Sequence, residues 1–400
     1  MPAGVSHGAG LPESTLSQTL NAELAPRYRL VILGDGLVPA KINNRGVVVG
    51  TDLNTNHPFV YRHGRVTELP LWRGDTLGGA SDVNNREQIV GFSLNPDVYV
   101  PNLHNCPPVC LQTHALLYEH RHVINLGQIP GAINWDNSAD LINDSGEIVG
   151  ESGTPNEEGG SRQITIFVPG PVRAVPDAYD GLSSRGFPTG LNNAGEIVGL
   201  HYDILGSLFA YPNTITCSPP LVFLYNGFTG INNAGNTISA PSGGAEGVTP
   251  APPVYCERGV GHQLQLSPLA INDRGDIVGT ATAPQGELYS QGTFHEIAAM
   301  TTGHRDASSS STITGTRPGN YFISSDGTLQ GYVMSFSPGD ALLYSKGRYY
   351  DLNDLVPNHR GIVLSNPVSI NIRREIVGSY RTASSEAGYL LVPDRDNDDR

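Results

Sequence analysis

An all-β fold, a single eight-bladed β-propeller closed by an N-terminal strand in the last blade, is predicted by three features of this 400-residue sequence. A nine-residue motif recurs eight times along the chain. Glycine and proline are abundant (48 and 30 residues), and no segment keeps a helical period over three or more turns. The last unit lacks one strand, which the N-terminus can supply. Seven blades are the alternative if one degenerate unit does not form.

The motif reads INNRGVVVG in its first copy, with two asparagines and a glycine between apolar residues. In the four-residue segment Asn43–Gly46, asparagine at the first position and glycine at the fourth favour a type I turn. Each copy therefore predicts a hairpin of two short strands. The ninth residue, usually glycine, lies in the second strand and indicates a β-bulge or a close backbone approach. We interpret the asparagines and glycines as turn formers and not as an active site. The copies span residues 42–50, 83–91, 142–150, 191–199, 231–239, 271–279, 323–331 and 370–378.

Two further strand candidates follow a typical hairpin, such as HPFVYRHG and RVTELP after the first copy. Four short strands per unit make one antiparallel blade. The eighth unit ends after GYLLVPD (388–394), whereas RYRLVILGD (27–35) precedes the first copy as RYYDLNDL (348–355) precedes the eighth. We therefore expect residues 27–35 to complete the last blade, which removes exposed sheet edges and favours a ring over a solenoid.

These units resemble the bacterial HAF repeats, named for a His-Ala-Phe strand that follows an IN…G.IVG hairpin. The resemblance covers about residues 28–393, although the fourth and fifth units keep the turn and lose the His-Ala-Phe strand. It implies a propeller architecture, a secreted or periplasmic location if a leader has been removed, and a scaffold role for His57 and His114. It implies no mechanism. The matching strands are HPF (57–59), HAL (114–116), DAL (340–342) and EAGY (386–389), with NLG (125–127) and DLN (351–353) after two of them.

The chain carries 24 basic and 38 acidic residues, a formal net charge of −14. Such a surface repels phosphate backbones and anionic lipids, so we expect neither nucleic acid nor a membrane as partner. No apolar run could span a bilayer, and the first residues lack the pattern of a signal peptide. We expect a monomer with residues 27–393 as one propeller domain, a flexible segment (1–26) and an acidic tail (394–400).

Cofactor chemistry has no support in the sequence. No glycine-rich phosphate loop follows a strand and opens a helix, and no G-x-S-x-G motif occurs. The cysteines form two candidate pairs, Cys106 with Cys110 and Cys217 with Cys256, and either disulfides or free thiols fit their spacing. Without nearby histidine pairs this spacing is poor for structural zinc, and we expect no metal.

The predicted turns within each hairpin are short, whereas the connections on the other face of the propeller are long and dissimilar. Long loops at one end of a rigid scaffold commonly carry function. We therefore expect the functional face to be formed by the connections at 69–81, 92–112, 127–140, 177–190, 298–320 and 355–367.

Both tryptophans of the chain fall in these connections, where an indole either anchors a ligand or fills the space between blades. A histidine near arginine or aspartate, as in GHRD (303–306), can act as a general acid or base. The catalytic candidates are His304, His359, Asp306 and His201. The ligand-binding candidates are Trp72, Arg73, Asp75, Trp135, Asp136, Arg185, Tyr202, Arg305 and Arg360.

Two functions fit these residues. The first is a propeller that binds a small organic molecule, a glycan or a peptide at the loop-decorated face and central pocket. The alternative is a cofactor-independent enzyme, such as a lyase, hydrolase or cyclase, that uses the His, Asp and Arg residues of the same loops. Binding ranks ahead because no group of residues has a catalytic spacing.

Overall fold

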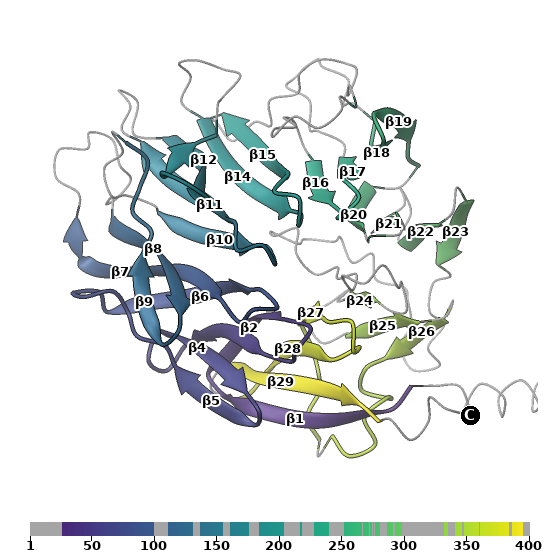
Figure 1. The fold of residues 1–400 in the computed structure, drawn as a ribbon. Coiled ribbons are helices and arrows are strands. Elements are labelled where there is room, and N and C mark those ends of the chain that lie inside the picture. Colours follow the sequence, from purple (N-terminus) through teal and green to yellow (C-terminus); the bar gives the residue numbers. More distant parts are fainter. Residues whose placement is uncertain are drawn as a thin grey trace, which may run out of the picture.

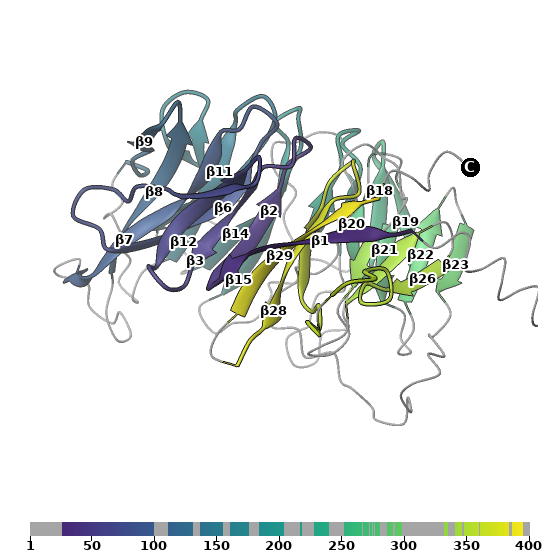
Figure 2. The same cartoon turned by 90° about the horizontal axis from the view of Figure 1, so that it is seen from below.

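The computed structural model describes most of the chain between residues 26 and 394, and Figures 1 and 2 show it from two sides. Both chain ends and the seventh motif lie outside the described residues. Within them every regular element is a β-strand, and no helix could cross a membrane. The described ranges are 26–99, 111–130, 137–154, 161–175, 184–203, 217, 228–239, 252–265, 267–271, 273, 275, 277–280, 286–290, 293–297, 332–334, 341–345, 348–359, 361–383 and 386–394.

The strands form several four-stranded antiparallel sheets, the arrangement of a propeller-like fold. The first two sheets, in order, are β2 (Leu37–Ile42), β3 (Val48–Asp52), β4 (His57–Arg62) and β5 (Arg65–Glu68), then β6 (Leu77–Val83), β7 (Ile89–Tyr99), β8 (Leu111–Glu119) and β9 (His122–Asn125).

A larger sheet follows, in which β12 also pairs with the first strand of the next unit. It contains β10 (Ser138–Ile142), β11 (Ile148–Thr154), β12 (Ser161–Val168), β13 (Arg173–Ala174), β14 (Ser184–Leu191) and β15 (Ile197–Asp203).

The second half of the chain repeats the pattern. Its sheets are β16 (Phe228–Ile231), β17 (Thr237–Ser239), β18 (Val254–Glu257) and β19 (Val260–Gln263); β20 (Ser267–Ile271), β21 (Ile277–Thr280), β22 (Gly286–Ser290) and β23 (Thr293–Ile297); and β24 (Tyr332–Met334), β25 (Leu342–Ser345) and β26 (Arg348–Asp351). The last sheet is β27 (Pro367–Ile370), β28 (Ile376–Arg381), β29 (Glu386–Pro393) and β1 (Tyr28–Asp35).

The N-terminal strand β1 pairs with the C-terminal strand β29, as the sequence predicts. Leu30 lies opposite Leu391 and Val31 opposite Leu390 in an antiparallel register. Tyr28 at the start of β1 is buried in one apolar cluster with Leu355 and Leu391. The two ends of the described chain therefore share one sheet, seen at the bottom of Figure 1.

Several predicted loops are shorter than expected because strands run into them. β6 begins at Leu77, β10 at Ser138 and β14 at Ser184, and β7 continues to Tyr99 before β8 begins at Leu111. The predictions of loops over 69–81, 92–112, 127–140 and 177–190 were wrong at these ends. The register between β7 and β8 shifts after Leu94, and pairing resumes at Tyr99 with Leu111. No alternation of apolar and polar residues in the sequence predicts this extension.

The first asparagine of the motif is buried and holds its own turn together. Oδ1 of Asn43 accepts the amides of Arg45 (3.0 Å) and Val47 (2.9 Å), and the amide of Gly46 donates to the Asn43 carbonyl (3.0 Å). Gly46 has a φ of 83°, which favours glycine. The predicted turn is thereby confirmed.

The same asparagine also binds the neighbouring unit. Nδ2 of Asn43 donates to the Asn84 carbonyl at 2.8 Å, and Nδ2 of Asn371 in the last motif donates to the Asn43 carbonyl at 2.9 Å. Equivalent bonds join the second motif to the third, the third to the fourth and the fourth to the fifth. The interpretation of these residues as turn formers alone was therefore incomplete. We call the buried series Asn43, Asn84, Asn143, Asn192, Asn232 and Asn371 the asparagine ladder.

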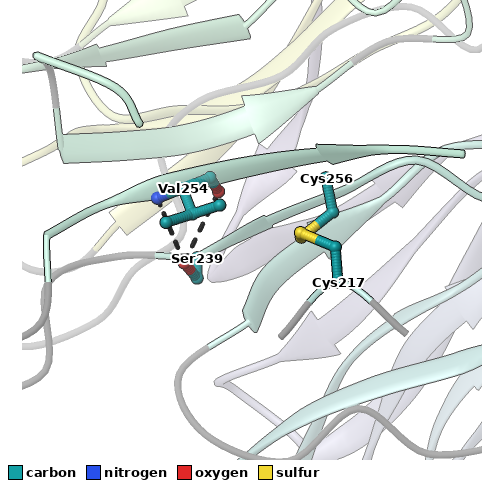
Figure 3. The surroundings of a disulfide bond; sticks show 4 residues. All are labelled: Cys217, Ser239, Val254 and Cys256. Carbon is teal, nitrogen blue, oxygen red and sulfur yellow. Dashed lines mark hydrogen bonds between the residues drawn. A yellow bond between two sulfur atoms is a disulfide. The ribbon is translucent and has the colours of Figure 1, made fainter. Parts of the chain in front are cut away.

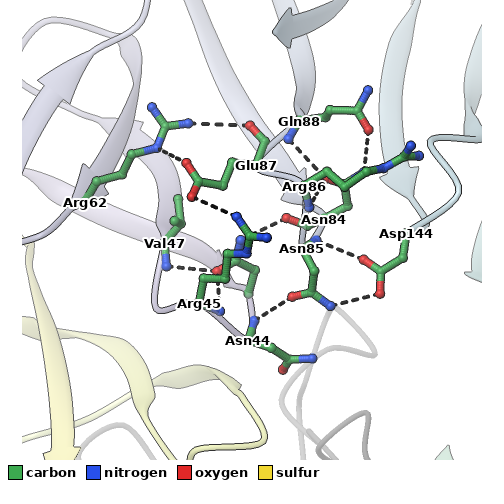
Figure 4. A network of polar contacts seen from close by, with 11 residues as sticks. Asn44, Arg45, Val47, Arg62, Asn84, Asn85, Arg86, Glu87, Gln88 and Asp144 are labelled. Atoms are coloured by element: carbon green, nitrogen blue, oxygen red, sulfur yellow. Dashed lines mark hydrogen bonds and ion pairs between the residues drawn. The ribbon is translucent and has the colours of Figure 1, made fainter. Parts of the chain in front are cut away.

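A second series of hydrogen bonds runs beside the asparagine ladder. The amide of Asn44 donates to Oδ1 of Asn85 (2.9 Å), and the amide of Asn85 donates to Oδ1 of Asp144 (2.8 Å), as Figure 4 shows. The amide of Ile372 donates to Oδ1 of Asn44 (3.2 Å), so this series also links the last motif to the first. Each turn is thus held by its neighbour's side chain.

Glycine at the ninth motif position lies against the backbone of the preceding strand. A Cβ on Gly150 would lie 1.9 Å from the Ser138 carbonyl oxygen, and the strand register shifts between Ala139 and Leu141 at this point. Gly50 and Gly91 have the same surroundings. Both the close approach and the bulge that the sequence predicts are present, the bulge in the partner strand.

Gly150→Ala is therefore expected to lower the free energy of unfolding by about 1–3 kcal/mol through overpacking, measured by urea unfolding. Ser239 at the equivalent position of the fifth motif shows that a sheet can accommodate a Cβ, so the variant is expected to fold. The control is Gly64→Asn, in a turn with open space around the glycine, where asparagine tolerates the positive φ. An equal loss in both variants would contradict the packing explanation.

Cys217 and Cys256 form a disulfide, one of the two alternatives that the sequence leaves open. The bond joins residues 39 positions apart, with a Cα–Cα distance of 5.5 Å. The bond ties Cys217, which lies outside the strands, to β18. Beside it, within the sheet, the Val254 amide donates to Ser239 Oγ (3.2 Å), as Figure 3 shows. Cys106 and Cys110 lie outside the described residues.

Candidate functional site

The connection from β5 to β6 carries Trp72, Arg73 and Asp75, three of the predicted ligand-binding residues. Its shape is set by hydrogen bonds to β7: the Thr76 amide donates to the Leu94 carbonyl (3.0 Å), and Asn95 Nδ2 donates to the Gly74 carbonyl (2.8 Å). Gly74 has a φ of 90°, a conformation that favours glycine. The connection is consequently fixed to a regular strand.

Asp75 turns its carboxylate inward onto β7 and β8. Its Oδ2 accepts the hydroxyl of Ser93 and lies 2.9 Å from Nδ1 of His114. Ser93 and His114 face each other across the β7–β8 ladder. The side chains of Asp75 and His114 are only 5% and 11% exposed, so this polar pair is largely removed from water. A buried carboxylate needs such partners, and here two strands provide them.

The buried hydroxyl of Tyr118 lies within the electrostatic influence of Asp75. Burial and, secondly, the negative charge of Asp75 raise the pKa of the Tyr118 hydroxyl above its ordinary value. Tyr118 belongs to the apolar cluster of Val49, Val83 and Leu116, against which Trp72 also packs. The carboxylate therefore lies at the edge of the apolar core, and Tyr118 stays neutral at physiological pH.

Trp72 lies beside this group. Its amide donates to Ser93 Oγ (3.3 Å), and the centroid of its ring lies 6.3 Å from that of His114. The guanidinium of Arg73 lies over the indole, 5.3 Å from its centroid. Trp72 is half-buried and Arg73 is exposed, so the tryptophan both fills space and presents a surface. We call Trp72 and Arg73 the indole–guanidinium shelf.

Ser93, Asp75 and Arg73 have different roles in this group. Ser93 is fully buried and donates to Asp75, so it is a support and not a nucleophile. Asp75 fixes the orientation of the imidazole of His114. Arg73 has no ion-pair partner among the described residues, and its charge faces solvent. The group can thus hold an anion or a flat ring at the shelf, beside an oriented histidine.

The remaining candidates are only partly described. Nδ1 of His359 lies 2.9 Å from the Ile362 carbonyl in the same turn, a local contact away from Asp75. The backbone of His201 and Tyr202 lies in β15, opposite Gly186 and Arg185, and only the backbone of these candidates is described. The other candidates lie outside the described residues: Trp135, Asp136, His304, Arg305, Asp306 and Arg360.

The connection between β9 and β10 also contacts β8. The amide of Asn137 donates to Thr113 Oγ1, and Asn137 Nδ2 donates to the Thr113 carbonyl (3.2 Å). Thr113 precedes His114 in β8. The hydrogen bonds of Asn137 therefore hold the residue immediately before β10 next to the site. In the described part of the chain, no group of three or more His, Cys, Asp or Glu residues could hold a metal ion.

His114 and Ser93 are the site residues that sequence reasoning missed. His114 was interpreted as scaffold because HAL (114–116) matches HPF (57–59). When the sheet of β2–β5 is aligned with the sheet of β6–β9 by strand register, Asp75 takes the position of Gly34. Of these two sheets, only the one with His114 therefore has a carboxylate at this position. His57 instead pairs with Glu68 on its own sheet. The exchange of glycine for aspartate at one repeat position was the available signal.

No family model matches the chain, and no curated protein matches it. A chain of the mitotic checkpoint complex is similar at 10% identity and a TM-score of 0.38, with 98% of this chain and 100% of that chain covered. The Trypanosoma rangeli sialidase in complex with sialic acid is similar at 10% identity and a TM-score of 0.32, with 92% of this chain and 59% of that chain covered.

Proposed function

We propose that the chain is a monomeric eight-bladed propeller of the HAF-repeat type, in which β1 closes the ring. Hydrogen bonds from the last motif to the first support closure: Asn371 Nδ2 to the Asn43 carbonyl and the Ile372 amide to Asn44 Oδ1. One motif copy per blade gives eight. The closed ring supplies a rigid frame on which the connection between β5 and β6 is held.

The proposed function is binding of a small organic molecule, a glycan or a peptide at the end of the sheets that carries Trp72. The observation that carries this proposal is the exposed guanidinium of Arg73, which lies over the half-buried indole and has no ion-pair partner in the described part of the chain. Asp75 does not neutralise Arg73, because its carboxylate is directed to Ser93 and His114. The shelf therefore favours a ligand that carries a carboxylate next to a sugar ring or an apolar ring.

Tryptophan fluorescence tests this proposal. In a Trp135→Phe background Trp72 is the only tryptophan of the chain, and its emission is followed. The protein is titrated with acidic compounds and their neutral counterparts. Oligomers of glucuronate are compared with oligomers of glucose, and peptides with a free C-terminus are compared with the same peptides amidated. At least one acidic compound is expected to change the emission. Arg73→Gln is expected to weaken its binding about 10-fold, a loss of about 1.4 kcal/mol. Arg258→Gln, which removes an exposed arginine in the turn between β18 and β19, is the control.

Two outcomes contradict binding at the shelf. One is that no compound in the panel changes the emission of Trp72. The other is that Arg73→Gln and Arg258→Gln weaken binding equally, because a general loss of positive charge would then explain the effect.

A cofactor-independent enzyme is the second candidate, supported by the contact of 2.9 Å between Asp75 and His114. A buried carboxylate that orients an imidazole is the arrangement of a general base in lyases and hydrolases. If the protein converts a compound that binds the shelf, His114→Gln is expected to abolish turnover and retain binding. Turnover that survives this substitution would contradict a role for His114.

A further inference from the structure

The opposite end of the sheets has an unexpected positive charge. Antiparallel strands alternate in direction, so the turn after the first strand and the turn after the third strand of each unit lie at the same end, away from Trp72. In the last unit and the first two, these turns contain seven arginines and three glutamates. We call them the basic turn surface: Arg45, Arg62, Arg65, Arg86, Arg121, Arg373 and Arg374, with Glu87, Glu119 and Glu375.

Three of these arginines occupy the same position of successive motifs. Arg373, Arg45 and Arg86 each occupy the fourth position of their nine-residue motif. Nη2 of Arg373 lies over Gly46, and Nη2 of Arg86 lies over Gly146, since an added Cβ would meet them at 2.3 and 2.6 Å. Nη1 of Arg45 lies 3.6 Å from Oε1 of Glu87, the residue that replaces glycine in the second motif. The guanidinium groups therefore point in register, each toward the next turn.

The acidic residues of this surface neutralise only part of it. Glu87 pairs with Arg45 and with Nε of Arg62 (3.0 Å), and Glu375 pairs with Arg373 (2.7 Å); Figure 4 shows the group around Glu87. Among the described residues, Arg65, Arg86 and Arg121 have no ion-pair partner. All three side chains are exposed. The surface keeps a net positive charge on a chain whose net charge is −14.

The fold does not need these charges. The third, fourth and fifth motifs carry Ser145, Ala194 and Ala234 at the position of the three aligned arginines. Their turns close with the same hydrogen bond, for example from the Gly195 amide to the Asn192 carbonyl (3.1 Å). An exposed arginine that can be exchanged for alanine within the same architecture has no evident structural duty, and surface ion pairs add little stability.

We infer that the basic turn surface binds a short acidic peptide segment of a partner protein. Guanidinium groups pair with carboxylates through two parallel hydrogen bonds, and three guanidiniums in register match carboxylates along an extended segment. Ile372, 39% exposed beside Arg373, offers an apolar contact that a peptide side chain can cover. The segment is short because the negative charge of the rest of the chain repels a long polyanion.

The test uses the fluorescein-labelled peptide Glu-Glu-Leu-Glu-Glu-Leu, with binding followed by fluorescence anisotropy at low salt. The triple variant R45Q/R86Q/R373Q is compared with R173Q/R258Q/R381Q, which removes the same charge from exposed arginines elsewhere. The whole 400-residue chain is used, and thermal unfolding shows that both variants fold. The turn variant is expected to bind about 10-fold or more weakly, whereas the control stays within about 2-fold of the unaltered protein.

Three outcomes would overturn the inference. The peptide does not bind the unaltered protein, or both variants lose affinity equally, which would indicate a general charge effect. Tighter binding of a heparin hexasaccharide than of the peptide would instead assign the surface to sulfated glycans. Because Arg73 is unchanged in both variants, none of these outcomes bears on the shelf at the other end.

Discussion

Asn192→Asp is expected to lower the free energy of unfolding by about 3–5 kcal/mol. Asn192 is buried, and all four of its hydrogen-bonding positions are used. Its Oδ1 accepts the amides of Ala194 (3.1 Å) and Glu196 (2.9 Å), and its Nδ2 donates to the Asn232 carbonyl (3.0 Å) and to Glu196 Oε2. Aspartate keeps the shape, but removes both donors and places a second carboxylate against Glu196. Urea unfolding followed by circular dichroism measures the loss.

Two matched substitutions separate this effect from a general sensitivity of the turn. Asn193→Asp is expected to change stability by less than about 0.5 kcal/mol, because Asn193 is exposed and other motifs carry Asp144 and Asp273 at its position. Asn84→Asp is expected to be milder than Asn192→Asp, since its neighbour Gln88 carries no charge. Equal losses in all three variants would contradict the importance of the asparagine ladder.

Removal of β1 is expected to have a still larger effect. A chain that begins at Gly36 loses the strand paired with β29 and the buried side chains of Tyr28 and Leu33. Each buried apolar side chain contributes about 1.5–3 kcal/mol, and a domain has only about 5–15 kcal/mol of total stability. The exposed edge of β29 also becomes free to pair with other chains. We expect aggregation and no cooperative thermal unfolding, measured by calorimetry and light scattering.

A circular permutant is the control for this deletion. The Asp394 amide donates to the Arg27 carbonyl at 2.8 Å, so a linker of about three residues can join residue 394 to residue 27. The permutant begins at Gly36 and carries β1 at its C-terminus. It is expected to unfold cooperatively, near the temperature of the unaltered chain. Aggregation of the permutant would contradict the assigned place of β1.

The parts of the fold that depend on local patterns could be predicted from the sequence. Asparagine and glycine at fixed offsets between apolar runs define the hairpins, and the strand missing after Leu391 defines the place of Val31. The asparagine ladder was not predicted, because the turn alone explains an asparagine at this position. A signal was present: Glu87 and Arg374 replace the turn glycine at positive φ (65° and 60°), yet both copies keep the first asparagine. A residue kept when its turn partner is lost has a second role.

The candidate site could be predicted only in part. Trp72, Arg73 and Asp75 were found because they lie in a long connection with unusual composition. Their partners were not found, since Ser93 and His114 lie 18 and 39 residues beyond Asp75 and meet it only through the register of β6, β7 and β8. Side-chain direction on a strand follows from register, and a bulge between Ala80 and Asp82 alters that register.

Cross-linking of β1 to β29 tests the proposed ring most directly. Val31 and Leu390 are opposed in the antiparallel ladder, where Cα atoms are close enough for a disulfide. Oxidation of the variant V31C/L390C is expected to give a monomer with a raised unfolding temperature. Mass spectrometry of its proteolytic fragments is expected to find the peptides that contain residues 31 and 390 joined by a disulfide. Failure to form this bond, or its formation only between two molecules, would contradict closure of the ring by β1.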